Sequence, residues 1–176
     1  MIRPPFNFQR WVEDNRHLLQ PPVGARKVFE DANFIIMVVG GPNTRKDYHI
    51  NQSEEFFWML EGDMTLKVVD GGVFRDIEIR EGDVFLLPGG VPHSPQRRAD
   101  TVGLVVERQR MPGERDGLRW YCESCATVLH ETFFEVEDFL GQMKAAINAF
   151  HGSETLRTCG ACGAVMAVPV AAQPAR

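Results

Sequence analysis

Short apolar runs separated by glycine-rich turns dominate the chain between residues 28 and 110. The runs are rich in Val, Ile and Phe, which is typical of β-strands. MTLKVVD and FRDIEI alternate on either side of the DGG turn at 70–72, so this pattern predicts a hairpin. Many short strands with such turns favour a sandwich or a small barrel. The predicted strands are FIIMVV (34–39), EFFWML (55–60), MTLKVV (64–69), VFRDIEI (73–79), DVFLL (83–87) and TVGLVVE (101–107).

Helical periodicity is found outside this zone. FQRWVEDNRHLL at 8–19 places its large apolar residues on one face, and PPVG at 21–24 is expected to end that helix. FLGQMKAAINAF at 139–150 predicts a second helix. We therefore expect a β-rich domain at 1–118, a C-terminal four-cysteine metal-binding segment at 119–166 and a disordered tail at 167–176, where small residues and proline dominate.

The composition excludes some classes of partner. The 176 residues, 44% of them hydrophobic, suffice for one domain with a core and a small appendage. A net charge of -5 argues against nucleic acid as a partner. The longest apolar runs are far too short to span a membrane. MIRPPFNFQRW lacks the features of a secretory signal, so we expect a cytoplasmic protein.

Four cysteines form two C-x2-C pairs, and 33 residues separate the pairs. Such pairs point two thiolates at one ion, which predicts a tetrathiolate metal site. Two disulfides are the weaker interpretation for a protein without an export signal. If the four cysteines were free buried thiols, the C-x2-C spacing of each pair would have no explanation. The sequence leaves open whether the metal is zinc or iron. The predicted ligands are Cys122, Cys125, Cys159 and Cys162.

A second candidate metal site comes from GDVFLLPGGVPHSPQR at 82–97. Its proline and two glycines predict a sharp turn that directs His93 inward from a strand beginning near residue 92. His49 and Glu55 are six positions apart, and they share a strand face only if INQS continues the strand. Two His and one carboxylate form the facial triad of non-haem iron(II) enzymes. The remaining histidines, His17, His130 and His151, are expected to be solvated or hydrogen-bonded.

These residues resemble the two cupin motifs. His49, Glu55 and Gly62 follow the spacing of the first motif, and Gly82, Pro88, Gly90 and His93 follow that of the second. Two positions depart from the motifs. Many cupins place a fourth ligand His where this chain has Asn51, and the second motif usually ends in Asn where this chain has Arg97.

A closer resemblance is to the 3-hydroxyanthranilate 3,4-dioxygenase family. It rests on GGPNTRKDYH, EEFF, LEGDM, FLLPGGVPHSPQR and GLVVERQR, and it runs from about residue 6 to 121. WYCESC and CGAC resemble the bacterial form, which has a rubredoxin-like iron site. The resemblance implies an all-β, cupin-type jelly-roll barrel with a short N-terminal helix and a small C-terminal metal-bound segment containing a helix. It also implies a homodimer.

The resemblance further implies an activity. Such an enzyme opens the ring of 3-hydroxyanthranilate with O2, giving 2-amino-3-carboxymuconate semialdehyde, which cyclises to quinolinate on the kynurenine route to NAD. The matched positions carry the implied roles. His49, Glu55 and His93 would hold Fe(II), Arg45 would bind oxygen, and Arg97, Glu107 and Glu55 would contact substrate.

Residue chemistry supports two of these roles independently. A substrate carboxylate in a partly dry pocket needs a fixed cation, and arginine offers two parallel hydrogen bonds. Arg97 is four positions after His93, so both can face one interior. Glu107 ends the apolar run VGLVVE, where an unpaired carboxylate would be costly to bury. A surface strand end with Glu107 paired to Arg108 or Arg110 is an equally good interpretation from sequence alone.

Other possibilities stay open at this stage. The four-cysteine site is interpreted as a structural clip. The family has Asn where this chain has Ala25, in a loop near the substrate, so substrate preference could differ. A cupin enzyme of another type, such as a sugar isomerase or epimerase, and a small-acid binding module are the alternative functions.

Overall fold

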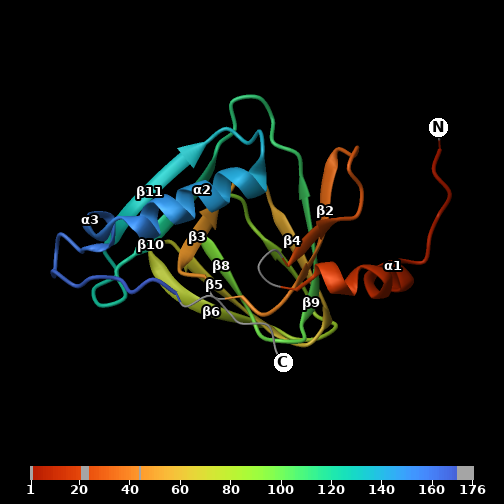
Figure 1. The fold of residues 1–176 in the computed structure, drawn as a ribbon, viewed down its shortest axis with the longest axis horizontal. Coiled ribbons are helices and arrows are strands. Elements are labelled where there is room, and N and C mark those ends of the chain that lie inside the picture. Colours follow the sequence, from red (N-terminus) through yellow and green to blue (C-terminus); the bar gives the residue numbers. More distant parts are fainter. Residues whose placement is uncertain (1, 21–23, 44, 170–176) are drawn as a thin grey trace.

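The computed structural model describes residues 2–20, 24–43 and 45–169, in which two antiparallel sheets face each other (Figure 1). The first sheet contains, in spatial order, β1 (Ala25–Lys27), β2 (Phe34–Gly40), β9 (Val102–Arg108), β4 (Glu55–Glu61) and β7 (Val84–Leu87). The second contains β11 (Val128–Phe134), β10 (Asp116–Tyr121), β3 (Asp47–Ile50), β8 (His93–Arg97), β5 (Met64–Asp70) and β6 (Val73–Ile79).

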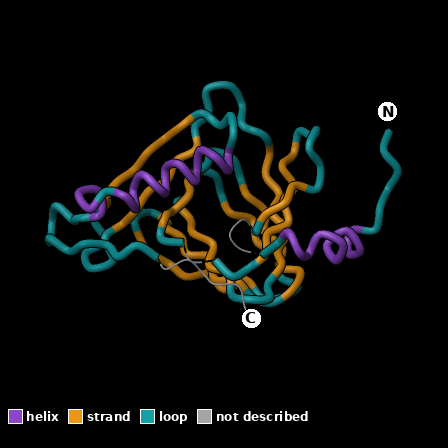
Figure 2. Tube along the Cα trace, in the orientation of Figure 1, coloured by secondary structure: helices purple, strands orange, loops and turns teal. Residues whose placement is uncertain are grey.

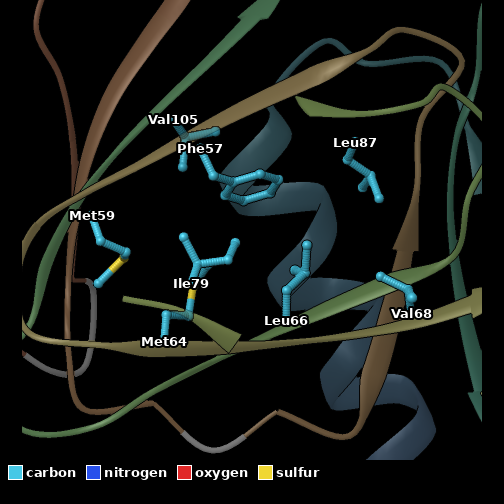
Figure 3. Packing of buried hydrophobic residues seen from close by; sticks show 8 residues of the cluster. All are labelled: Phe57, Met59, Met64, Leu66, Val68, Ile79, Leu87 and Val105. Atoms are coloured by element: carbon cyan, nitrogen blue, oxygen red, sulfur yellow. The ribbon is translucent and has the colours of Figure 1, made fainter. Parts of the chain in front are cut away.

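The main core fills the space between the two sheets. Because side chains alternate between the faces of a strand, every second residue of each strand points inward. Phe57 and Val105 from the first sheet point toward Leu66 and Ile79 from the second (Figure 3). Val, Leu, Ile, Met and Phe side chains fill one part of the interior. Buried polar and charged side chains occupy another part.

The N-terminal helix covers part of the outer face of the first sheet. Helix α1 (Phe8–Asn15) begins after Asn7, whose Oδ1 accepts a hydrogen bond from the Arg10 amide at 2.8 Å. The chain continues as a 3-10 turn, η1 (Arg16–Leu18). Val12 of the helix packs against Val38 and Val102 of the sheet. The helix predicted at 8–19 is thus confirmed, with a tighter last turn, and its predicted terminator at 21–24 lies mostly outside the described residues.

The C-terminal segment lies on the opposite side of the strands (Figure 2). It contains α2 (Phe139–Gly152) and the short α3 (Glu154–Arg157). A second core forms there, in which the Trp120 and Phe150 rings stack at 4.3 Å between centroids. The predicted helix at 139–150 is confirmed.

The sequence patterns predicted the apolar strands correctly, and the expected all-β architecture is confirmed. In the predicted hairpin Asp70 pairs with Val73, and Gly71 and Gly72 both have positive φ, as a two-residue hairpin turn requires. The apolar patterns did not predict β1, β3, β10 and β11. No helix of the described residues is long and apolar enough to cross a membrane. Residues 170–176 of the predicted tail lie outside the described residues.

Candidate metal centre and substrate pocket

The three residues of the predicted facial triad come together from both sheets. His49 on β3 pairs directly with His93 on β8, and their ring centroids are 5.1 Å apart. Glu55 begins β4 in the facing sheet, and its Oε2 lies 3.0 Å from His93 Nε2. One possible ligand atom from each residue can be chosen so that the three atoms lie within 4.8 Å of one another, and all three residues are buried. Two imidazoles and one carboxylate in this arrangement fit a non-haem iron(II) ion.

The route by which His49 and Glu55 meet differs from the prediction. β3 ends at Ile50 and β4 begins at Glu55, so the intervening residues do not continue a strand. The parity argument for this pair is therefore wrong. The two side chains meet because the sheets that carry them face each other.

Protonation of Glu55 is set by its neighbours. Burial alone would raise its pKa, but His93 and His49 outweigh burial and hold the pKa below its usual range. Glu55 is therefore ionised, which is the form that binds a metal.

Both histidines are oriented by hydrogen bonds outside the triad. His93 Nδ1 lies 3.0 Å from the Val91 carbonyl, which leaves Nε2 facing Glu55. His49 Nε2 lies 2.7 Å from Asp116 Oδ2. Carboxylate and carbonyl partners of this kind fix the ring orientation of metal-binding histidines.

Arg110 links Asp116 to Glu107. Its Nε and Nη2 donate to the Asp116 carboxylate at 2.8 and 2.6 Å, and its Nη1 lies 2.7 Å from Glu107 Oε2. Burial opposes ionisation of Asp116, but Arg110 and His49 outweigh it and lower the pKa to about 2. The sequence did not point to Asp116, and it suggested Arg110 only as a surface partner of Glu107. Arg110 ends the quoted segment GLVVERQR and Asp116 lies outside the quoted segments, and neither position is a ligand position of the two cupin motifs.

Asn51, at the position of the missing fourth ligand, bridges two carboxylates. Its Nδ2 is 2.9 Å from Glu107 Oε2 and 3.4 Å from Glu55 Oε2. Glu55 and Glu107 are cross-strand neighbours on β4 and β9. Burial and the Glu55 charge raise the pKa of Glu107 to about 7, against the opposing effects of Arg110 and Asn51. Glu107 can therefore gain or lose a proton near neutral pH.

Arg97 is buried and forms no ion pair with a carboxylate of the described residues. Its side chain is directed at the Met59 sulfur, 3.5 Å from Nη1, and its Nε has no hydrogen-bond partner among the residues that the structure describes. Burial lowers its pKa to about 10. Gly103 makes room for the guanidinium, since a Cβ there would lie 2.5 Å from Arg97 Nη1. The Glu55 charge offsets burial only in part, so Arg97 favours an anionic ligand in this pocket.

Arg45 has a different environment. It pairs with Asp47, with its Nε 3.2 Å from Asp47 Oδ2. Burial would lower the Arg45 pKa, but the Asp47 carboxylate raises it above its ordinary value. Arg45 therefore keeps its charge at the edge of the pocket.

These polar residues line one cavity of about 690 Å³. Such a volume suits a small aromatic molecule. Apolar side chains from β2 and from helix α2, together with Ala25, form the opposing walls. Ala25, predicted to lie in a loop, is the first residue of β1. The residues expected to bind metal and substrate therefore share a single pocket, which contains Arg45, His49, Glu55, His93, Arg97 and Glu107.

The four cysteines form a second cluster, away from this cavity. Two sulfur pairs, Cys122–Cys162 and Cys125–Cys159, are 3.6 and 3.5 Å apart. Four thiolates around one ion, with bonds of about 2.3 Å, would be separated by roughly 3.8 Å, so the cluster fits a tetrahedral metal site. A disulfide would need about 2.05 Å. The two cysteine turns also have similar backbones. Ala126 follows Cys122, and Gly163 follows Cys159, by the same number of residues, and both Ala126 and Gly163 have positive φ.

Comparisons with known proteins decide the family. The model of the 3-hydroxyanthranilic acid dioxygenase family matches residues 1–151. The chain belongs to this family. A 3-hydroxyanthranilate 3,4-dioxygenase from Neurospora crassa is 53% identical over 163 residues, which are 93% of this chain and 90% of that protein. One from Xanthomonas euvesicatoria is 52% identical over 169 residues, 96% of each chain.

A solved structure is also similar. A cupin-2 domain protein from Shewanella frigidimarina has a TM-score of 0.48 and 19% identity, and covers 59% of this chain and 94% of its own. Membership of the dioxygenase family confirms the predicted resemblance. It favours a dioxygenase over the two alternatives, a sugar isomerase or epimerase and a small-acid binding module.

Proposed function

We propose that this chain opens the ring of 3-hydroxyanthranilate with O2 to give 2-amino-3-carboxymuconate semialdehyde. The observation that carries the proposal is Arg97, a buried guanidinium without a carboxylate partner among the described residues, facing the cavity that holds the triad. The substrate carboxylate is an anion of the right size to pair with it. The family and its relatives give the reaction.

His49, Glu55 and His93 would hold Fe(II), and these donors suit it. Iron bound there would supply a centre at which the substrate and O2 are brought together. The chain itself positions the reactants. Arg97 would orient the substrate through its carboxylate, and the apolar walls exclude water.

Glu107 and Arg45 have complementary roles in the proposal. Glu107, with a pKa raised to about 7 by burial and Glu55, would accept a proton from the substrate phenol or amine. Glu55 would contact the same groups. Arg45, charged and at the pocket edge, would bind O2 and stabilise negative charge that develops on oxygen.

We further propose that the four cysteines bind a second ion, iron or zinc, on the basis of their sulfur spacing. The division into 1–118, 119–166 and 167–176 and a cytoplasmic location stay predictions.

The proposed homodimer has a candidate surface. On the outer face of the first sheet, Trp58, Val84 and Leu86 are 38%, 61% and 53% exposed. They are neighbours across β4 and β7, beyond the part that α1 covers. A sheet with an apolar outer face is expected to be covered. A second copy of the chain is the partner that we propose.

Oxygen uptake tests the reaction. The Fe(II)-loaded protein is expected to consume one O2 per 3-hydroxyanthranilate, and a His93→Ala variant is expected to consume none because it loses a metal ligand. An oxygen electrode and product absorbance give the two readouts. Absence of uptake by the wild-type protein with iron bound would exclude this substrate.

A further inference from the structure

Helix α2 belongs to two parts of the molecule at once. Leu140, Met143 and Ile147 line the catalytic cavity. Met143 and Ile147 also pack in the second core, where Phe150 of the same helix stacks on Trp120. The packing of the second core therefore fixes the position of α2, which forms one wall of the pocket.

The first turn of α2 reaches the candidate metal centre. The Phe139 ring lies 5.4 Å from the His49 ring, and the Arg110 guanidinium lies 5.7 Å from the centre of the Phe139 ring. Figure 1 shows the helix crossing from this point over the strands of the C-terminal segment. A displacement of α2 would therefore change the shape of the pocket.

The last turn of α2 is tied to the cysteine cluster. Arg157 Nε donates to the His151 carbonyl at 3.1 Å, and Arg157 Nη1 donates to the Met166 carbonyl at 2.7 Å. Thr158 and Val165 form a bridge at the base of the second cysteine turn. These bonds join the end of the helix to the turn that carries Cys159 and Cys162.

The other cysteine turn follows β10 directly. Cys122 comes after Tyr121, the last residue of β10, and its amide donates to the Thr127 carbonyl at 2.7 Å. β10 also carries Asp116, the partner of His49, and pairs with β3. Four thiolates on one ion would therefore fasten the end of α2 to the strand that borders the metal centre.

From this connection we propose that the metal of the four-cysteine site positions helix α2 as a wall of the substrate pocket. Its loss weakens substrate binding and leaves the metal at His49, Glu55 and His93 in place. Cysteine–metal coordination contributes to folding free energy directly, so a helix anchored this way depends on it. The identity of the substrate rests on the proposed function.

The test compares Cys162→Ala with Ser124→Ala, a matched control in the other cysteine turn that keeps all four thiols. Hydrogen exchange of residues 139–152, metal content, and anaerobic binding of 3-hydroxyanthranilate to the Fe(II)-loaded protein are measured. Cys162→Ala is expected to lose the thiolate metal, to exchange faster in α2 and to bind substrate roughly tenfold more weakly. Ser124→Ala is expected to behave as the wild type.

A second variant keeps the proposal falsifiable if Cys162→Ala does not fold. Phe150→Leu leaves the cysteines intact but loosens the stacking of α2 on Trp120. It is expected to bind substrate more weakly with both metals retained. Wild-type affinity in either folded variant, despite faster exchange in α2, would overturn the proposal, as would unchanged exchange after loss of the thiolate metal.

The two proposals fail differently. If the wild-type protein does not bind 3-hydroxyanthranilate, the proposed function is wrong. The exchange measurement on α2 still decides whether the cysteine metal holds the helix.

Discussion

Gly103 leaves the space that the buried Arg97 guanidinium occupies. The guanidinium lies over Gly103, and its Nη1 lies 3.5 Å from the Met59 sulfur. Neither neighbour neutralises the charge. The folded protein therefore holds a cation in position before substrate arrives, which lowers the ordering cost of binding an anion.

Gly103→Ala tests this arrangement. The added Cβ would lie 2.5 Å from Arg97 Nη1 and 3.1 Å from the Met59 sulfur, so the guanidinium must move. The dissociation constant for 3-hydroxyanthranilate, measured anaerobically, is expected to rise by about tenfold or more. Gly152→Ala is the control, because a Cβ there meets nothing within 4 Å. Equal affinities in the two variants would contradict the role of Arg97.

Glu107 predicts a pH dependence. Burial and the Glu55 charge raise its pKa to about 7, so the residue is protonated below that pH and ionised above it. A proton acceptor must be ionised. We therefore expect kcat/KM to fall about tenfold per pH unit below 7 and to level off above it.

Glu107→Gln supplies the control for this profile, because the amide does not titrate. Its kcat/KM is expected to be lower at all pH values and to lack the acidic limb. If the variant keeps the limb, another group titrates and Glu107 acts only in positioning.

At the scale of elements, β10 joins the parts of the active site. It pairs with β3, which carries His49, and it begins with Asp116. Arg110 then connects Asp116 to Glu107 on β9. The candidate ligand His49 and the proposed proton acceptor Glu107 are therefore held by one buried ion-pair network.

Asp116→Asn tests the network. The amide keeps the shape of the side chain, but it removes the charge that binds Arg110 and orients His49. Loss of such a partner typically costs 10- to 100-fold in metal affinity, on the order of the effect that we expect here. Iron retention is measured by competition with a chelator. Wild-type retention would show that the Asp116 charge does not orient His49 for metal binding.

The strands differ in how well the sequence predicted them. β2, β4, β5 and β9 are apolar runs, and the patterns predicted all four. β3 reads DYHI and β8 reads HSPQR, so polar site residues replace the apolar alternation there. The motif spacing identified His49 and His93, whereas the hydrophobic pattern missed β3. A strand that carries polar site residues loses its hydrophobic alternation, so the alternation cannot be used to predict that strand.

At the scale of the whole molecule, the site depends on contacts between distant segments. Asp116 is 67 positions from His49, and Asn51 is 56 positions from Glu107. No local pattern encodes such pairs, since they arise only when the two sheets and the C-terminal segment come together. The motifs identify the candidate ligands His49, Glu55 and His93, but not Asp116 and Asn51, which contact His49 and Glu55.

The outer face of the first sheet is relevant to assembly of the proposed dimer. α1 covers Val38 and Val102 at one end of this face and leaves Trp58, Val84 and Leu86 exposed at the other. Burial of apolar surface stabilises by about 25 cal/mol per Å², so a second copy that covers this area would gain appreciable free energy. The residues of β4 and β9 that line the pocket, Glu55, Phe57, Val105 and Glu107, lie on the other face of this sheet.

Leu86→Lys tests this surface. A charge in the centre of an apolar contact would have to be desolvated, which should dissociate the dimer. Sedimentation velocity is expected to show a monomer for this variant and a dimer for the wild type. Val73→Lys is the control, since Val73 is also 53% exposed but lies on β6 of the other sheet. A dimer that survives Leu86→Lys and dissociates in Val73→Lys would assign the interface to the second sheet instead.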